Sequence, residues 1–176
     1  MPRCNTMTAE HTSGWDDAGD MQVLTFEMSG ETFAIEAKLL REILDGIPET
    51  TVPGAPAMVS GLANFRGRVI PLADLHMAFG FKDGSTTRDS RIIVIELDMN
   101  GEDTLVGLKA DKVHEVTVLK KAAAEAAPCV GMRWRQDFIR CIAKRAGDFI
   151  VVPDLERVFA NGCGALSPPP SIAVQH

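Results

Sequence analysis

The stretch VSGLANFRGRVIPLADLHMAF (59–79) contains two apolar segments that flank Arg66, Gly67 and a second arginine. A later stretch, IRCIAKRAGDFIVVPDLERVF (139–159), has the same plan. When the first stretch is shifted by 80 positions onto the second, six residues are identical. The identical pairs are Ala63/Ala143, Gly67/Gly147, Ile70/Ile150, Asp74/Asp154, Leu75/Leu155 and Phe79/Phe159. This shared plan predicts an internal repeat made of a strand, a glycine turn, a second strand, an aspartate helix cap and one or two helical turns.

Arg66 does not belong to the shared plan. The residue opposite it in the second stretch is Ala146, whereas the adjacent glycine recurs as Gly147. Because an architectural residue is expected in both copies, Arg66 is a candidate for function, and arginine often anchors protein interfaces. A structural role is the alternative, since the planar guanidinium suits a bond to loop carbonyls or to a carboxylate such as Glu42. The two roles are compatible.

The N-terminal part of the chain predicts a β-hairpin. In QVLTFEM (22–28) apolar and polar residues alternate, so that Leu24, Phe26 and Met28 share one face. A Ser-Gly pair then turns the chain into ETFAIE (31–36), which alternates in the same way. We therefore expect two antiparallel strands with one apolar face.

Short strands and brief helices are expected in the rest of the chain. Further strands are predicted at 49–52, 91–98 and 104–119, and helical structure is limited to a short helix at 37–46, one turn at 56–61 and a loop or frayed helix at 120–129. About ten short strands at regular spacing indicate an all-β barrel architecture. The repeat indicates that there are two such barrels.

Composition and charge narrow the class of protein. The 176 residues carry a formal net charge of −6 and the isoelectric point is near 5.2, which argues against a nucleic-acid-binding surface. The four cysteines lack CxxC spacing, which favours a reducing compartment. No segment approaches the roughly 18 apolar residues that direct membrane insertion needs. We expect a cytoplasmic protein whose domain at 21–160 lies between flexible segments at 1–20 and 161–176.

No catalytic, cofactor-binding or metal-binding constellation is expected. His76 and His114 are each isolated, without a carboxylate or second histidine at the spacing of metal ligands. Asp74 and Asp154 are interpreted as helix caps, because a carboxylate accepts the free N–H groups of a first helical turn. Cys141, on a predicted strand, is expected to be a buried small hydrophobe. The sequence offers no acid–base or nucleophile–base pair.

The run VPGAPAMVSGLANFRGRVIPLADLHMAFG (52–80) closely resembles the signature of the CheW family, the coupling proteins of bacterial chemotaxis. The residues that carry this resemblance are Pro53, Pro56, Gly61, Asn64, Arg66, Gly67, Pro71, Asp74 and Leu75. The segments FAIE (33–36), LLREIL (39–44) and ADKVHEV (110–116) also resemble the family. The sequence departs from the family pattern at Phe65, at Lys112 and over 120–136.

The resemblance implies a non-enzymatic adaptor without a cofactor. CheW-like proteins consist of two SH3-like five-stranded β-barrels, and they bind the cytoplasmic tip of methyl-accepting chemoreceptors and a CheA-type histidine kinase. Such a protein is cytoplasmic and is recruited to receptor arrays at the membrane. By position in the family, the residues implied in receptor or kinase coupling are Leu40, Glu42, Gly61, Asn64, Arg66 and Val116.

Each of these assignments has a structural alternative. Residues such as Leu40 and Val116 are more often core than contact, and Glu42 can lie on a solvated helix face. Gly61 is interpreted as a close-packing position, at which a larger side chain would fill a binding groove. Two further functions stay open: a coupler in a chemosensory pathway that does not drive flagella, and a small ligand-binding barrel or enzyme.

Overall fold

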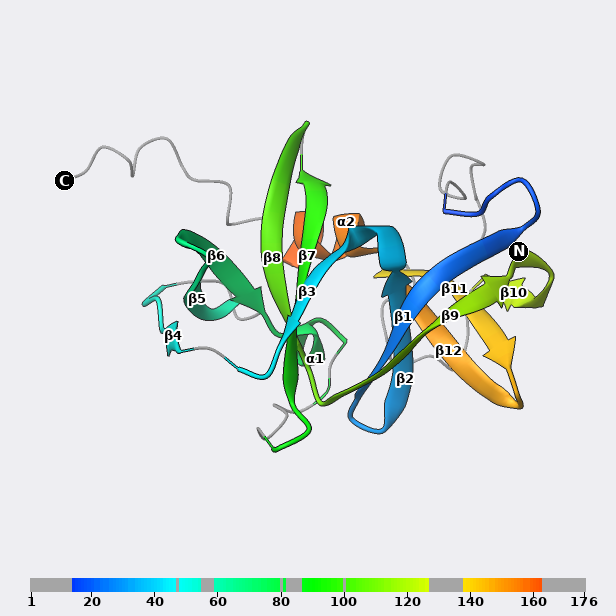
Figure 1. Cartoon of the computed structure of the whole chain (residues 1–176), viewed down its shortest axis with the longest axis horizontal. Helices are drawn as coiled ribbons and strands as arrows, with labels where there is room; N and C mark the ends of the chain where they lie inside the picture. The colour runs from blue at the N-terminus through cyan, green and yellow to red at the C-terminus, as the bar shows by residue number, and fades with distance from the viewer. Residues whose placement is uncertain are drawn as a thin grey trace, which may run out of the picture.

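Two six-stranded sheets, here called sheet A and sheet B, make up most of the molecule (Figure 1). The computed structural model describes residues 14–46, 48–54, 59–79, 81, 87–99, 101–126 and 138–162. Sheet A contains β1 (Asp20–Met28), β2 (Glu31–Glu36), β9 (Lys112–Lys120), β10 (Ala124–Glu125), β11 (Ile139–Arg145) and β12 (Asp148–Pro153), in the order β10-β11-β12-β2-β1-β9. Sheet B contains β3 (Leu40–Leu44), β4 (Glu49–Thr50), β5 (Val59–Phe65), β6 (Arg68–Ala73), β7 (Arg91–Met99) and β8 (Glu102–Ala110), in the order β3-β7-β8-β6-β5-β4.

The predicted all-β architecture with two five-stranded subdomains is confirmed. Each sheet has five strands of at least five residues, and a two-residue strand, β4 or β10, lies at one edge. The two sheets also share one plan: a hairpin in the middle, an edge strand on one side, and the repeat unit on the other. In both sheets the hairpin meets the repeat unit through a parallel pair, β2 with β12 and β8 with β6.

Each half of the chain gives its hairpin to the sheet of the other half. The hairpin β1–β2 precedes the first repeat unit in the sequence, but it pairs with β9 and β12 of the second half. The hairpin β7–β8 belongs to the second half, but it pairs with β3 and β6 of the first. Along the described strands, the chain therefore passes between the sheets twice. One crossing is the 3-10 turn η2 (Ala37–Leu39) between β2 and β3, and the other is Asp111 between β8 and β9.

Three apolar clusters fill the interior. A central cluster joins both sheets and the helices α1 (Leu75–Ala78) and α2 (Leu155–Gly162). Its buried members include Leu24, Phe26, Met28, Phe33, Ile35, Phe79, Ile93, Ile95, Leu108, Val151, Leu155 and Phe159. A cluster inside sheet A contains Met21, Val23, Ala34, Leu119, Cys141, Ala143, Ile150 and Val152. A cluster inside sheet B contains Ala63, Phe65, Ile70, Leu72, Ile92, Val94 and Leu105.

The two hairpins bury both of their faces. Leu24, Phe26 and Met28 face the central cluster, as the alternation of the sequence predicts, and the intervening Val23 faces the inside of sheet A. A fully buried Leu or Phe side chain contributes about 1.5–3 kcal/mol to folding. Because the central cluster draws such residues from both sheets, the two barrels stabilise each other.

The predicted repeat unit is confirmed in both copies. The turns at Arg66-Gly67 and Ala146-Gly147 have φ values of 52° and 83°, and of 53° and 86°. Positive φ at both central residues is the geometry of a type I′ turn, whose twist matches the flanking strands. Asp74 accepts the His76 N–H at 3.0 Å, which confirms the expected helix cap, and Asp154 accepts the Arg157 N–H at 3.2 Å.

The expected short helix at 37–46 is wrong. Only η2 is helical, and the next five residues form β3, which pairs antiparallel with β7. In β3, the half-buried Leu40, Glu42 and Leu44 alternate with the exposed Arg41 and Ile43, which is the period of a strand. Tertiary pairing with β7 therefore decides the conformation of a segment whose apolar residues also suit a helix.

Other local expectations are met only in part. Val59 and Ser60, which belong to the expected helical turn at 56–61, lie in β5, and residues 55–58 fall outside the described ranges. Within the expected loop at 120–129, a 3-10 turn at Lys121–Ala123 precedes β10, and residues 127–129 lie outside the description. In the described ranges, no helix has the length and apolar character that a membrane span would need.

The first and last secondary-structure elements that the structure describes are β1 and α2. β1 begins at Asp20, and Trp15 packs against the cluster inside sheet A, so the last residues of the expected N-terminal arm join the domain. At the other end, α2 continues to Gly162.

Gly107→Ala tests the packing between the hairpin β7–β8 and its neighbours. A Cβ at Gly107 would lie 2.6 Å from Leu72 Cδ2 and 3.0 Å from Ile92 Cγ2. Overpacking of this kind costs about 1–3 kcal/mol. We expect denaturant unfolding to show that loss for Gly107→Ala and none for the control Gly46→Ala, because a Cβ at Gly46 meets nothing within 4 Å. Equal stabilities of the two variants would contradict the packing described.

Candidate functional site

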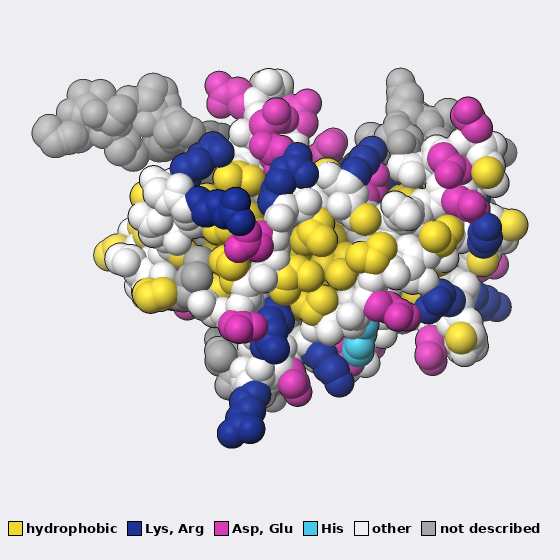
Figure 2. Space-filling model, in the orientation of Figure 1, with side chains coloured by type: hydrophobic (Ala, Val, Ile, Leu, Met, Phe, Trp, Pro, Cys, Tyr) yellow, Lys and Arg dark blue, Asp and Glu magenta, His cyan; other side chains and the backbone are white. Residues whose placement is uncertain are grey.

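The edge strands β3 and β9 expose apolar side chains. Of the large hydrophobic residues on these strands, Ile43 is 38% exposed, Val116 52% and Val118 39%. Figure 2 shows hydrophobic side chains gathered in the middle of the face on which β3 and β1 lie in Figure 1. Ile43 lies opposite Ile93, and Val116 lies opposite Leu24, and both of these partners belong to the central cluster. Ile43 and Val116 therefore occupy corresponding places in the two sheets.

Arg66 and Glu42 form an ion pair that closes sheet B. In the strand order, β3 is separated from the β5–β6 hairpin by β7 and β8, yet the Arg66 guanidinium donates to the Glu42 carboxylate. The sheet must therefore curl until its edge strand reaches the turn. The guanidinium also lies over the ring of Phe65, 5.3 Å from its centroid. The pairing of Arg66 with Glu42 that the sequence suggested is confirmed, and the Arg66 side chain is still 72% exposed.

A similar ion pair lies in sheet A. Nη1 of Arg145, at the end of β11, lies 3.7 Å from Oε1 of Glu115 on the edge strand β9. Arg145 comes one residue before its turn, whereas Arg66 lies within the corresponding turn. A comparison at the fixed shift of 80 positions pairs Arg66 with Ala146, so it overlooks this basic residue. An ion pair between the repeat unit and the edge strand is thus found in both sheets. An exposed arginine within the turn itself is found only in the first repeat unit, at Arg66.

Three other predicted site residues have clear structural roles. Asn64 is exposed, and its Oδ1 accepts the N–H of Gly67 at 3.0 Å, which fixes the turn that carries Arg66. Leu40 is half-buried against the central cluster. A Cβ at Gly61 would lie 2.7 Å from the carbonyl oxygen of Thr50 in β4. The close-packing interpretation of Gly61 is therefore confirmed, and a larger side chain there would displace β4.

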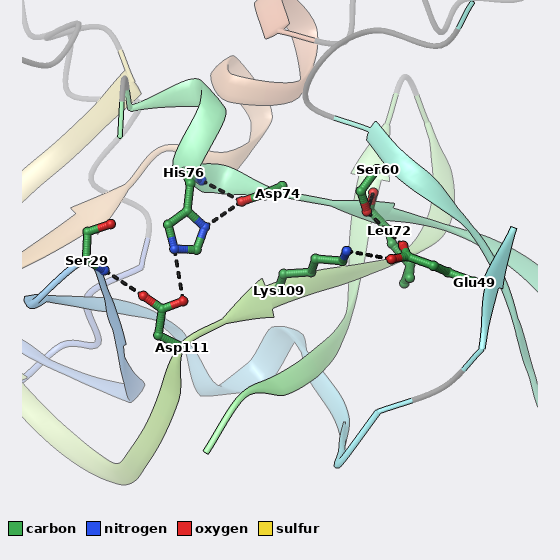
Figure 3. A network of polar contacts seen from close by, with 8 residues as sticks. All are labelled: Ser29, Glu49, Ser60, Leu72, Asp74, His76, Lys109 and Asp111. Atoms are coloured by element: carbon green, nitrogen blue, oxygen red, sulfur yellow. Dashed lines mark hydrogen bonds and ion pairs between the residues drawn. The ribbon is translucent and has the colours of Figure 1, made fainter. Parts of the chain in front are cut away.

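His76 is held between two carboxylates, which contradicts its interpretation as an isolated histidine. Its side chain is 3% exposed, and Nδ1 lies 2.5 Å from Asp74 Oδ1 while Nε2 lies 3.0 Å from Asp111 Oδ1 (Figure 3). The contact with Asp74 raises the pKa of His76, burial opposes this, and the contact with Asp111 raises the pKa further. Asp74, two residues away, was visible as a potential partner in the sequence. The contact with Asp111 depends on the fold.

The other histidine and the cysteine that the structure describes lie apart from His76. His114 Nε2 lies 3.2 Å from Glu27 Oε2 on the neighbouring strand. Cys141 is buried as expected, and burial raises the pKa of its thiol to about 11, so the thiolate is disfavoured at neutral pH. In the described parts of the chain, no group of three or more His, Cys, Asp or Glu side chains is arranged to hold a metal ion.

A polar cavity lies beside the η2 crossing, where the sequence indicated nothing. It has a volume of about 220 Å³, and its walls include Glu36, Lys38, Arg140 and Glu156. Glu36 Oε1 accepts from Arg140 Nη1 at 2.5 Å, and Lys38 Nζ lies 3.0 Å from Oε2. Burial alone would raise the pKa of Glu36, but the bonds from Arg140 and Lys38 lower it. The cavity wall therefore combines this ion network with apolar residues such as Leu39, Leu97 and Leu155.

Comparison with known proteins identifies related chains over nearly the whole domain. The family model described as CheW-like domain matches residues 22–162. The chain is 27% identical over 156 residues to the chemotaxis protein CheW of Rhizobium meliloti (strain 1021), which covers 89% of this chain and 96% of that protein. It is 28% identical over 143 residues to the probable chemotaxis protein CheW of Rhizobium etli, covering 81% and 90%. The crystal structure of the scaffolding protein TtCheW from Thermoanaerobacter tengcongensis superposes with a TM-score of 0.71 and 29% identity, covering 81% of this chain and 94% of that one.

Arg66→Ala is expected to leave the fold almost unchanged. The turn accepts alanine, because Ala146 has nearly the same φ in the second copy. An exposed ion pair contributes about 0–1 kcal/mol, so denaturant unfolding should show a loss within that range. Glu42→Gln should cost a similar amount, and the double variant should cost little more than either single one. A loss above about 2 kcal/mol for Arg66→Ala would mean that the ion pair is a main support of the barrel.

Proposed function

Because the chain belongs to the family of CheW-like proteins, we propose that it couples chemoreceptors to a CheA-type histidine kinase in a chemosensory pathway. The observation that carries the proposal is the family match over residues 22–162, which spans both sheets and both repeat units. The protein is a scaffold in this role. It acts by holding two partners together, in the cytoplasm and at receptor arrays.

The structure suits a binding role better than catalysis. An enzyme needs reactive side chains that converge where a substrate can reach them. His76, the histidine with two carboxylates beside it, is 3% exposed and both of its ring nitrogens face protein atoms. The exposed side chains of the edge strands instead include the apolar Ile43 and Val116, and Glu42 on β3 is paired with Arg66, as in an interface.

We assign receptor binding to the edge strands β3 and β9 together with the β5–β6 turn. A receptor tip is a helical hairpin, and a helix docks through a few apolar anchors. Ile43 and Val116 are exposed at corresponding places and can supply such anchors. Arg66 can supply a polar anchor, because its guanidinium is mostly exposed even while it contacts Glu42.

The other candidate residues act as supports in this proposal. Leu40 seats β3 on the central cluster, and Asn64 fixes the turn that presents Arg66. Gly61 lets β4 approach β5 and so keeps the rim of sheet B in place. Substitutions of these residues would weaken coupling through a change in shape.

Val116→Asp and Ile43→Asp should each weaken receptor binding strongly. In a complex, the new carboxylate would be buried against apolar receptor side chains, at a cost of several kcal/mol when it is unpaired. Calorimetric titration with a soluble receptor-tip hairpin should show an affinity loss of about 100-fold or more. Phe149→Asp is the matched control, because Phe149 is 59% exposed on β12 and lies outside the assigned surface.

Circular dichroism must first show that all variants are folded. In the same titration Arg66→Ala should lose about 2 kcal/mol of binding free energy, the usual cost at an arginine anchor. Folded Val116→Asp and Ile43→Asp variants that bind the receptor tip as well as the unchanged protein does would overturn the assigned surface. Failure of the unchanged protein to bind any receptor tip would overturn the coupling function.

A further inference from the structure

One of the two crossings between the sheets is tied by side chains from both. Asp111 is the crossing residue between β8 of sheet B and β9 of sheet A. Its Oδ2 accepts the N–H of Ser29 at 2.7 Å, and its own N–H donates to the carbonyl of Glu27 at 2.9 Å. Both contacts lie at the turn end of the β1–β2 hairpin. Asp111 is therefore fixed to sheet A.

His76 ties this crossing to sheet B. It lies on α1, the helix that follows β6, and Asp74 both caps that helix and contacts Nδ1 of the ring (Figure 3). The other ring nitrogen lies 3.0 Å from Asp111 Oδ1 but makes no well-aligned hydrogen bond there. The ring of Phe81 meets the His76 ring edge-on with centroids 6.4 Å apart. The contact of His76 with Asp74, on the side of sheet B, is thus tighter than its contact with Asp111, which joins the two sheets.

The contact between His76 Nε2 and Asp111 Oδ1 is here called the histidine bridge. The charges around His76 make this bridge depend on one proton. A protonated imidazole donates from both nitrogens, whereas a neutral one donates from one and accepts at the other. The groups that face the ring are the carboxylates of Asp74 and Asp111. Lys109 acts on Asp74 from β8 and pairs with Glu49 at 2.7 Å. A neutral ring that keeps its hydrogen on Nδ1, toward Asp74, would present a lone pair to Asp111 and lose the contact between the sheets.

Among the residues that the structure describes, no histidine bridges the other crossing. The position 80 residues after His76 is Glu156, which lines the polar cavity beside η2 together with Lys38. The histidine bridge is therefore a property of one half of the molecule. It lies where β9 begins, and β9 carries Val116 five positions after Asp111.

We propose that His76 is a positioning residue for coupling: its protonated ring ties Asp111 to sheet B, and loss of the proton releases this tie, so that β9 is no longer held against sheet B at the crossing and the affinity for the receptor hairpin falls. The part of this inference that concerns affinity rests on the proposed function. The bridge itself can be tested on the protein alone.

The direction of the pH dependence follows from the raised pKa of His76. A group whose pKa is raised by folding stabilises the folded state fully below its unfolded pKa, which is about 6.5 for histidine. That stabilisation is lost as the pH rises through the folded pKa. The bridge should therefore be closed in mildly acidic solution and open in alkaline solution.

The bridge is tested by nuclear magnetic resonance of the full chain. The ring signals of His76 should titrate with a midpoint above 6.5, and the amide of Ser29, which donates to Asp111, should shift with the same midpoint. The amide of Gly67 is the control, because it donates to Asn64 in another part of sheet B. A His76 ring that titrates without any change at Ser29 would overturn the bridge.

The effect on coupling is tested by titration with the receptor-tip hairpin at about pH 6 and pH 9. The affinity of the unchanged protein for the hairpin should be lower at the higher pH by about fivefold or more, the usual size of coupling between two sites. His76→Gln should bind with the lower affinity at both pH values, and the control Phe149→Asp, which lies outside the assigned surface, should keep the pH dependence of the unchanged protein. If His76→Gln does not fold, Asp111→Asn takes its place, since the amide oxygen can still accept from Ser29.

The outcomes separate the two claims. A pH dependence of binding that persists in folded His76→Gln or Asp111→Asn would overturn the role of His76 in coupling. A protein that binds no receptor tip at any pH would overturn the proposed function. In that case the shared midpoint of His76 and Ser29 would still decide whether the bridge exists.

Discussion

The structure depends on the exchange of two hairpins between the halves of the chain. Sheet A needs β1–β2 from the first half, and sheet B needs β7–β8 from the second. Without its borrowed hairpin, each sheet would lose the strands that join its edge strand to its repeat unit. The same hairpins bury one face in the central cluster, so the exchange also fixes the two barrels against each other. Such an arrangement suits a scaffold, because the surfaces on the two barrels keep one relative position.

The proposed receptor-binding surface lies where the exchange of hairpins leaves the edge strands of the two sheets. β3 and β9 come directly after the two crossings, and each lies at the outer edge of a sheet beside a borrowed hairpin. Ion pairs from the hairpin turns of the repeat units, Arg66 with Glu42 and Arg145 with Glu115, hold these edges in place. The apolar residues Ile43 and Val116 are thereby presented on rigid strands, which suits recognition of a helix. The His76 bridge acts on the beginning of the same strand β9.

The sequence predicts the features that depend on neighbouring residues and misses those that depend on the fold. Turn glycines, aspartate caps and the alternating face of β1 are encoded locally, and the structure confirms them. The strand β3 was mistaken for a helix because its pairing partner β7 lies about 50 residues away. The exchange of hairpins leaves the 80-residue repeat unchanged, so the repeat cannot reveal it. The contact of His76 with Asp111 joins residues of different sheets and has no signature in the sequence.

Hydrogen exchange of the full chain with and without a receptor-tip hairpin tests the central claim most directly. If receptor binding uses the edge strands, the hairpin should slow exchange in β3 (Leu40–Leu44) and β9 (Lys112–Lys120), whose outer edges lie at the assigned surface. The β7–β8 turn at Gly101, outside that surface, should exchange at an unchanged rate. Slower exchange at that turn, with none in β3 or β9, would contradict the proposed mode of coupling.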